Sequence, residues 1–247
     1  MSEIGEGFQP QPTIIETVKT EPKTEIIEKA QRIVSQVGID TNIARQKDQD
    51  STNVVDQNLK RFKGDYNATT SQPGPQELKY KVEPVIRDID QKIVLIKSMV
   101  NNFGSDQISV QGRLENILKQ ISNIDDLNQV KDLVNEANQV FKSNVDKLSN
   151  DRDQSRIVKN RLNDSAHQNE MTIRQIINNK QYDSSFKPGS SSQALLERCQ
   201  ISSRFLANQI DSVVQTSNQT DFSFKNNIHE NQQQFTNILQ SLIQSKN

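Results

Sequence analysis

Apolar residues recur along this chain in alternating steps of four and three, and one run is more regular than the others. It occupies Val82, Ile86, Ile89, Ile93, Ile96, Val100 and Phe103. Steps of four and three average 3.5 residues, so on an α-helix these side chains line one seam that must be buried against other helices. The run therefore predicts a helix with a continuous packing surface.

The start of this helix depends on Pro84. Proline is tolerated in the first helical turn, where its missing N–H has no partner in any case. A helix that starts there leaves Val82 just outside, whereas a helix that starts near Leu78 contains the proline and is kinked by it. Gly104 follows the seam, and we expect the helix to end there.

Weaker ladders predict further helices toward the C-terminus. Apolar runs lie within 110–124 and 127–148, and Ser122 followed by Asp125 resembles a capping box that would separate them. The polar segment 149–156 is either a loop or the exposed middle of one very long helix. A thinner apolar stripe continues beyond it.

Helix-breaking proline and glycine, together with serine, lie at both ends of this region. Residues 181–192 read as a linker, and two amphipathic segments within 193–247 predict a C-terminal helical hairpin. Five of the seven prolines lie before residue 76, so residues 1–77 are predicted to form a flexible arm. We read 39–77 as a linker within it.

One short amphipathic helix is expected inside the arm, at about residues 24–37, ended by Gly38. Its apolar face either docks on the body of the protein or binds a partner. The candidate partner-binding residues are Ile26, Ile27, Ile33, Val34 and Val37.

Together these elements predict an all-α fold: an elongated antiparallel bundle of coiled-coil-like helices over 78–180, with a largely disordered N-terminal arm. Val85 and Met99 widen the main seam beyond a two-helix contact, which favours packing within the chain. The alternative is a seam that pairs between chains in a homo-oligomer, because Ile at both core positions also suits parallel coiled coils. The hydrophobic fraction of 32% is low, which suits narrow apolar stripes.

Charge and targeting signals indicate where the protein works. The chain has 30 basic and 31 acidic residues, so no global field favours nucleic acid, and we expect none as a partner. It shows no recognisable signal peptide and no apolar run long enough to span a bilayer. The single Cys199 fits a reducing compartment. We therefore expect an intracellular protein, cytoplasmic or associated with a virion.

Candidate chemistry is sparse. His167 and His229 fall in separate helical segments, without the paired ligand spacing of a zinc site, and Cys199 falls on an apolar helix face. No glycine-rich phosphate loop or nucleophile elbow occurs in the sequence. We predict that the protein is not an enzyme and has no catalytic residue, cofactor or metal site.

The ladders favour a non-enzymatic structural or assembly protein that binds partner proteins through amphipathic helix faces. The polar, Asn- and Gln-rich composition suits a component of a large assembly such as a virion, a cilium or a cytoskeletal scaffold. The alternative is a peripheral adaptor that contacts membrane or nucleic acid through the helix at 24–37 or the basic cluster at 156–161. A second basic cluster lies at 59–63, and acidic neighbours make a solvated helix face the simpler interpretation of both clusters.

Overall fold

A computed structural model of the chain describes residues 22–72, 76–179, 189 and 191–244. These residues form helices and short connections, with no strand among them, which confirms the predicted all-α fold. The helices are α1 (Lys23–Thr70), α2 (Gln76–Asn102), α3 (Gln107–Asn123), α4 (Leu127–Asn178) and α5 (Ser191–Gln244).

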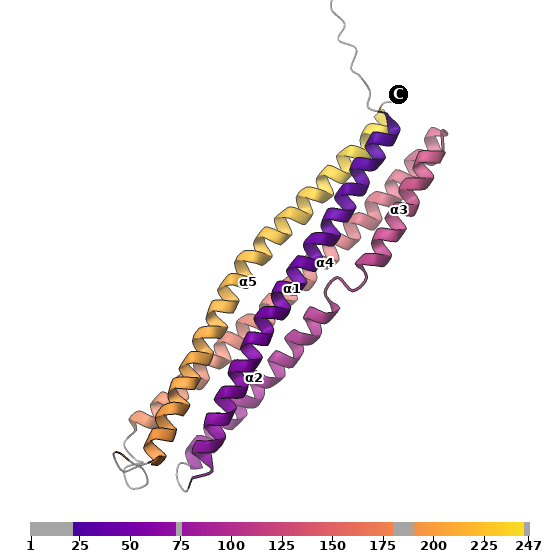
Figure 1. Ribbon diagram of the computed structural model, residues 1–247. Helices are drawn as coiled ribbons and strands as arrows, with labels where there is room; N and C mark the ends of the chain where they lie inside the picture. The colour runs from indigo at the N-terminus through magenta and orange to yellow at the C-terminus, as the bar shows by residue number, and fades with distance from the viewer. Residues whose placement is uncertain (1–21, 73–75, 180–188, 190, 245–247) are drawn as a thin grey trace, which may run out of the picture.

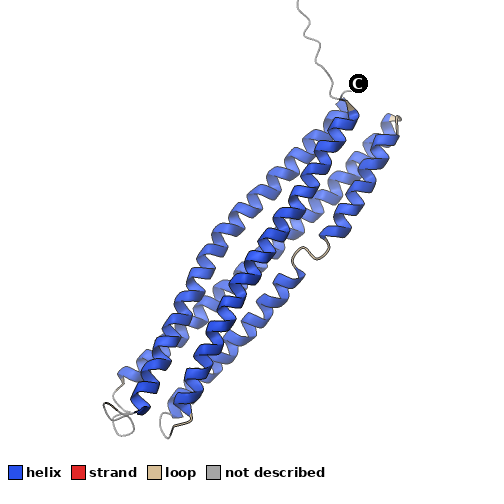
Figure 2. Ribbon diagram, viewed as in Figure 1, coloured by secondary structure: helices blue, strands red, loops and turns tan. Residues whose placement is uncertain are grey.

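The described helices form four antiparallel columns in an elongated bundle (Figures 1 and 2). Helices α1, α4 and α5 each run the length of the bundle, and α2 and α3 follow one another along the fourth column. Helix α5 packs between α1 and α4 on one side, and the α2–α3 column packs between them on the other. At 1.5 Å per residue, the 54 residues of α5 span about 80 Å.

The apolar core divides into two clusters along this length. One cluster contains the buried apolar side chains of α3 and the other those of α2, and side chains of α1, α4 and α5 contribute to both. We call the first the α3 half; it is built from residues within 26–44, 103–121, 130–148 and 224–242. We call the second the α2 half; it is built from residues within 55–66, 78–100, 162–176 and 196–214.

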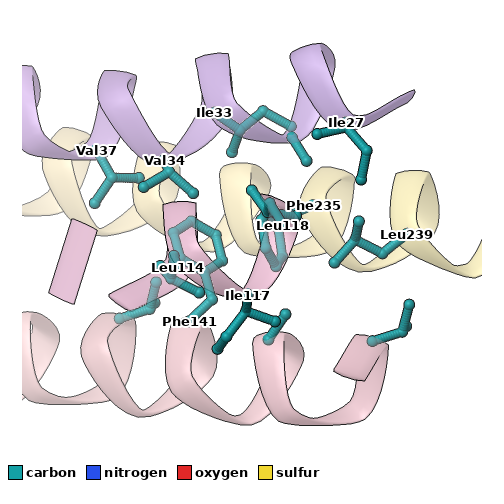
Figure 3. Close-up of a cluster of buried hydrophobic side chains, with 14 of the residues drawn as sticks. Ile27, Ile33, Val34, Val37, Leu114, Ile117, Leu118, Phe141, Phe235 and Leu239 are labelled. Carbon is teal, nitrogen blue, oxygen red and sulfur yellow. The ribbon is translucent and has the colours of Figure 1, made fainter. Parts of the chain in front are cut away.

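The α3 half is packed around aromatic rings. Phe141 of α4 and Phe235 of α5 lie with their ring centroids 4.4 Å apart. Ile27 of α1 and Leu118 of α3 are buried in the same cluster (Figure 3). Side chains from all four columns therefore meet at this level.

The seam from Val82 to Phe103 lies inside the chain. All seven of its side chains are at most 5% exposed. Those from Val82 to Val100 belong to the α2 half, whereas Phe103 belongs to the α3 half. The helix begins at Gln76, so Pro84 lies within it rather than in its first turn.

The prediction of a flexible arm over 1–77 is wrong for much of its length, because α1 is continuous from Lys23 to Thr70. Residues 1–21 lie outside the described part of the chain. The short helix predicted at 24–37 does not end at Gly38, and the linker predicted at 39–77 is helical as far as Thr70. The cause is a polar stretch of the inward face beyond Gly38, at Thr41, Asp48 and Thr52, before apolar residues resume at Val55. The hydrophobic pattern fades there although the helical spacing continues.

The five candidate partner-binding residues of this segment are also buried in the α3 half, so they form core in this structure rather than an open surface. Their helix docks on the body of the protein, which was one of the two alternatives. The sequence pattern could not separate these alternatives because a core face and a partner-binding face have the same spacing.

Two predicted breaks have different outcomes. Helices α3 and α4 do separate near residues 122–125, but Asp126 provides the cap: its Oδ1 accepts a hydrogen bond from the backbone N–H of Gln129 at 2.8 Å. The hairpin predicted within 193–247 is wrong, because α5 runs without interruption from Ser191 to Gln244. Most of the linker predicted at 181–192 lies outside the described residues.

The turn between α2 and α3 depends on Gly104. Its φ is +65°, in the left-handed region that favours glycine. A Cβ atom added there would lie 2.3 Å from Cγ2 of Thr41. The turn that joins α2 to α3 within the fourth column therefore depends on the absence of a side chain at this position.

Candidate functional site

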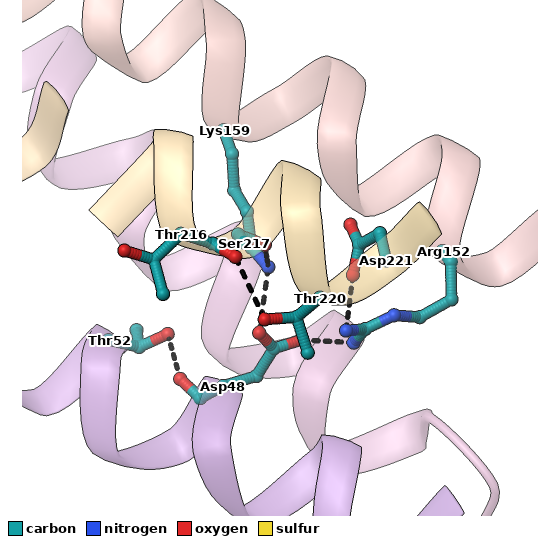
Figure 4. A network of polar contacts seen from close by, with 8 residues as sticks. All are labelled: Asp48, Thr52, Arg152, Lys159, Thr216, Ser217, Thr220 and Asp221. Carbon is teal, nitrogen blue, oxygen red and sulfur yellow. Dashed lines mark hydrogen bonds and ion pairs between the residues drawn. The ribbon is translucent and has the colours of Figure 1, made fainter. Parts of the chain in front are cut away.

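Four charged side chains lie in the bundle interior between the two halves. Asp48 comes from α1, Arg152 and Lys159 from α4, and Asp221 from α5. Each is at most 6% exposed. We call these four residues the charged layer (Figure 4).

Asp48 is the centre of the charged layer, because it pairs with both cations. Its Oδ1 accepts a hydrogen bond from Lys159 Nζ at 2.9 Å, and its Oδ2 accepts one from Arg152 Nη1. Lys159 Nζ also donates to Ser217 Oγ at 2.7 Å, and Arg152 Nη2 forms an ion pair with Asp221. Two acids and two bases balance formally, so the interior holds four charges with no net charge when all are ionised.

Aromatic rings connect the charged layer to the fourth column. The guanidinium carbon of Arg152 lies 5.0 Å from the ring centroid of Phe103, the last residue of the predicted seam. It lies 5.7 Å from the ring of Phe224 in α5. Both distances suit a cation–π contact in a desolvated site. All four columns therefore contribute to the environment of Arg152.

Burial dominates the electrostatics of Asp221 within the layer. It raises the pKa of the Asp221 carboxyl, and the attraction of Arg152 and Lys159 offsets this only in part. Within the described structure, Arg152 Nε and Ser155 Oγ are buried without a hydrogen-bond partner. An unpaired buried polar atom costs about 1–3 kcal/mol. The layer is thus a costly feature that an apolar core would not need.

The sequence contains a signal for the layer that hydrophobicity alone does not detect. The predicted ladder of α4 stops at Leu148, and by its composition the polar segment 149–156 suggests a loop or an exposed helix face. It is helical, and the steps of four and three simply continue with polar residues in the inward positions. The continued ladder runs Leu148, Arg152, Ser155, Lys159 and Leu162.

The same continuation occurs in the two helices that face α4. In each, polar residues occupy inward positions between apolar ones, at the level of Arg152. The positions are Ala44, Asp48, Thr52 and Val55 in α1, and Val214, Ser217, Asp221 and Phe224 in α5.

The other residues considered from sequence are not gathered into a site. His167 is exposed on α4, and His229 is half-buried on α5. Cys199 is buried, and desolvation raises the pKa of its thiol to about 12, which leaves the thiol protonated and poorly nucleophilic. Within the described ranges, no group of three or more His, Cys, Asp or Glu side chains is placed to hold a metal ion.

Acidic neighbours pair with much of both basic clusters. In the 59–63 cluster, Lys60 Nζ lies 2.9 Å from Asp56 Oδ2, and Lys63 Nζ lies 3.1 Å from Asp90 Oδ2. Burial acts to raise the pKa of Asp56, but hydrogen bonds and charge attraction from Lys60 and Lys97 together hold it below its usual value. In the 156–161 cluster, Lys159 belongs to the charged layer.

None of the described helices combines the length and the apolar character that a membrane span requires. Comparison with known proteins gives no match: no family model fits the chain, and no curated protein or solved structure is significantly similar to it. The charged layer and the outer faces of the bundle are therefore the features from which a function must be argued.

Proposed function

We propose that this chain is a non-enzymatic structural or assembly protein that binds partner proteins through the outer faces of its helices. An assembly such as a virion, a cilium or a cytoskeletal scaffold would suit its elongated shape. The proposal rests mainly on exposed apolar side chains that lie one helical turn apart on long helices.

Two such pairs occur on neighbouring columns. Ile39 and Ile43 are about half exposed on α1, and Ile201 and Phe205 are 65% and 44% exposed on α5. Residues four apart share one helix face, so each pair forms a short apolar stripe. A partner helix or groove recognises such a stripe through anchors at this spacing. The pairs lie in opposite halves of the bundle, so a partner could be held at separated points.

The experiment is proximity labelling and cross-linking in the native source, with identification of the labelled proteins by mass spectrometry. The full chain is compared with a double variant, Ile201→Ser with Phe205→Ser. A matched control carries Gln233→Ser and Asn237→Ser, which are exposed polar residues at the same spacing on the same helix. We expect defined protein partners that the first variant loses and the control retains.

Two results would overturn the proposal. One is the absence of any enriched protein partner in the native source. The other is a partner set that survives serine substitution of both apolar pairs. Circular dichroism of each variant must match the unaltered chain, so that a lost partner reports a lost contact rather than unfolding.

The peripheral adaptor remains the second hypothesis, but the geometry does not favour it. The apolar face at 24–37 is buried in the core, and Lys159 in the basic cluster at 156–161 is committed to Asp48.

A further inference from the structure

The charged layer coincides with three other features at one level of the bundle. The two apolar clusters meet there without sharing a buried residue. The fourth column is interrupted beside Arg152, because α2 ends at Asn102 and Phe103, whose ring lies near Arg152, leads into the turn at Gly104. A small apolar cavity of about 10 Å³ lies directly beside Lys159 and is also lined by Thr52 and Ile93.

These features weaken the coupling between the halves. A buried ion network contributes little net free energy, because desolvation of the charges offsets their attraction. Because of the interruption, no continuous helical hydrogen-bond ladder connects α2 to α3. Only α1, α4 and α5 pass through the layer, and each half closes its own apolar cluster.

We propose that the charged layer is a joint between two cooperative units, and that the α2 half opens while the α3 half stays closed. Opening of this unit exposes the seam from Val82 to Val100, which is the most regular apolar surface of the chain. This opening is a property of the chain alone and does not depend on the proposed partners.

The α2 half is the weaker unit for two reasons. Pro84 lies inside α2, where proline removes a backbone hydrogen bond and crowds the preceding turn. The cavity beside the layer is lined by Val55, Ile93 and Leu162 of the α2 half, so these residues lack some contacts. The α3 half instead contains the close Phe141–Phe235 pair.

Hydrogen–deuterium exchange of the full chain, read by mass spectrometry, tests this directly. Helix α4 is the best reporter because it is continuous through both halves. We expect amides within 162–176 to exchange about tenfold faster, or more, than amides within 130–148, with the change located between Leu148 and Leu162. Equal protection along α4, a change located elsewhere, or faster exchange in the α3 half would overturn the inference.

A pair of matched variants provides the second test. Val82→Ala and Val134→Ala remove the same atoms from fully buried core positions, Val82 in the α2 half and Val134 in the α3 half. Val82→Ala should speed exchange within 162–176 several-fold and leave 130–148 within about twofold of the unaltered chain, and Val134→Ala should do the reverse. A single cooperative unit would instead respond to either variant with the same loss of protection in both segments.

Discussion

At the scale of single residues, Asp48 and Asp221 are the same residue type in the same layer but have different roles. Asp48 accepts hydrogen bonds from two buried cations, whereas Asp221 forms one ion pair with Arg152. Removal of Asp48 therefore leaves Lys159 with Ser217 as its remaining hydrogen-bond partner, and a buried charge that loses its partner is strongly destabilising. The two carboxylates are not interchangeable.

We predict that Asp48→Asn lowers the free energy of unfolding by about 3–5 kcal/mol, the range for breaking a buried ion pair. Asp221→Asn should lower the free energy of unfolding by clearly less, because burial already disfavours the ionised form of the Asp221 carboxyl. Urea denaturation at neutral pH, followed by circular dichroism, measures both. An equal or larger loss from Asp221→Asn would show that Asp48 is not the centre of the layer.

The raised pKa of Asp221 also predicts how stability depends on pH. Because the folded protein holds this proton more tightly than the unfolded chain, the contribution of Asp221 is fully present below the unfolded pKa of about 3.9 and is lost as pH rises through the higher folded pKa. The unfolding free energy of the unaltered chain should therefore fall relative to Asp221→Asn as pH rises from about 4 toward neutrality. A difference that is constant or grows with pH would contradict this.

At the scale of elements, the helices continue where their hydrophobic patterns stop. The ladders of α2 and α3 were visible in the sequence because apolar residues fill nearly every inward position. Helix α1 was truncated in the prediction at Gly38, and α5 was divided near residue 220, because Thr, Ser and Asp occupy inward positions there. Both helices remain continuous because these polar residues are paired rather than solvated. Thr41 and Thr52 donate to backbone carbonyls of their own helix, whereas Asp48, Ser217 and Asp221 pair across the bundle.

The interruption between α2 and α3 has the opposite origin, since one residue enforces it. Gly104→Ala should lower the free energy of unfolding by about 1–3 kcal/mol, because alanine is strained at positive φ and its Cβ would meet Thr41. Gly112→Ala is the matched control: it lies within α3 with no atom close to the added Cβ, and should stabilise by about 0.5–1 kcal/mol. Thermal unfolding of both variants distinguishes them, and stabilisation by Gly104→Ala would refute the account of this turn.

At the scale of the whole molecule, the seam around Ile89 determines whether the α2 half closes within one chain. In this structure Ile89 is completely buried by residues of the same chain. A coiled coil that pairs between chains would place the same seam at a subunit interface. The two arrangements respond differently to a charge placed in the seam.

We predict that Ile89→Asp and Ile93→Asp each abolish the cooperative unfolding of the α2 half, because an unpaired carboxylate enters its apolar core, while the α3 half keeps its helices. Circular dichroism reports helix content, and analytical ultracentrifugation reports mass. A variant that keeps its helices and only falls from an oligomer to a stable monomer would show that the seam joins separate chains. Val94→Asp, at an exposed position of the same helix, is the control and should leave both readouts unchanged.

The sequence by itself determined the all-α class, the elongated bundle and a buried seam at Val82–Phe103, because alternating apolar spacing must be buried against other helices. Only the tertiary structure placed that seam within one chain. Only the tertiary structure decided that Asp48, Arg152, Lys159 and Asp221 lie in the interior. A polar residue at an inward position looks like a surface residue until the helices that face it are known. Whether such a residue is solvated or paired depends on side chains about 60–110 positions away in sequence, since Asp48 meets Lys159 at a separation of 111 residues and Lys159 meets Ser217 at 58. The spacing of one helix does not contain that information, whereas the packing of four columns does.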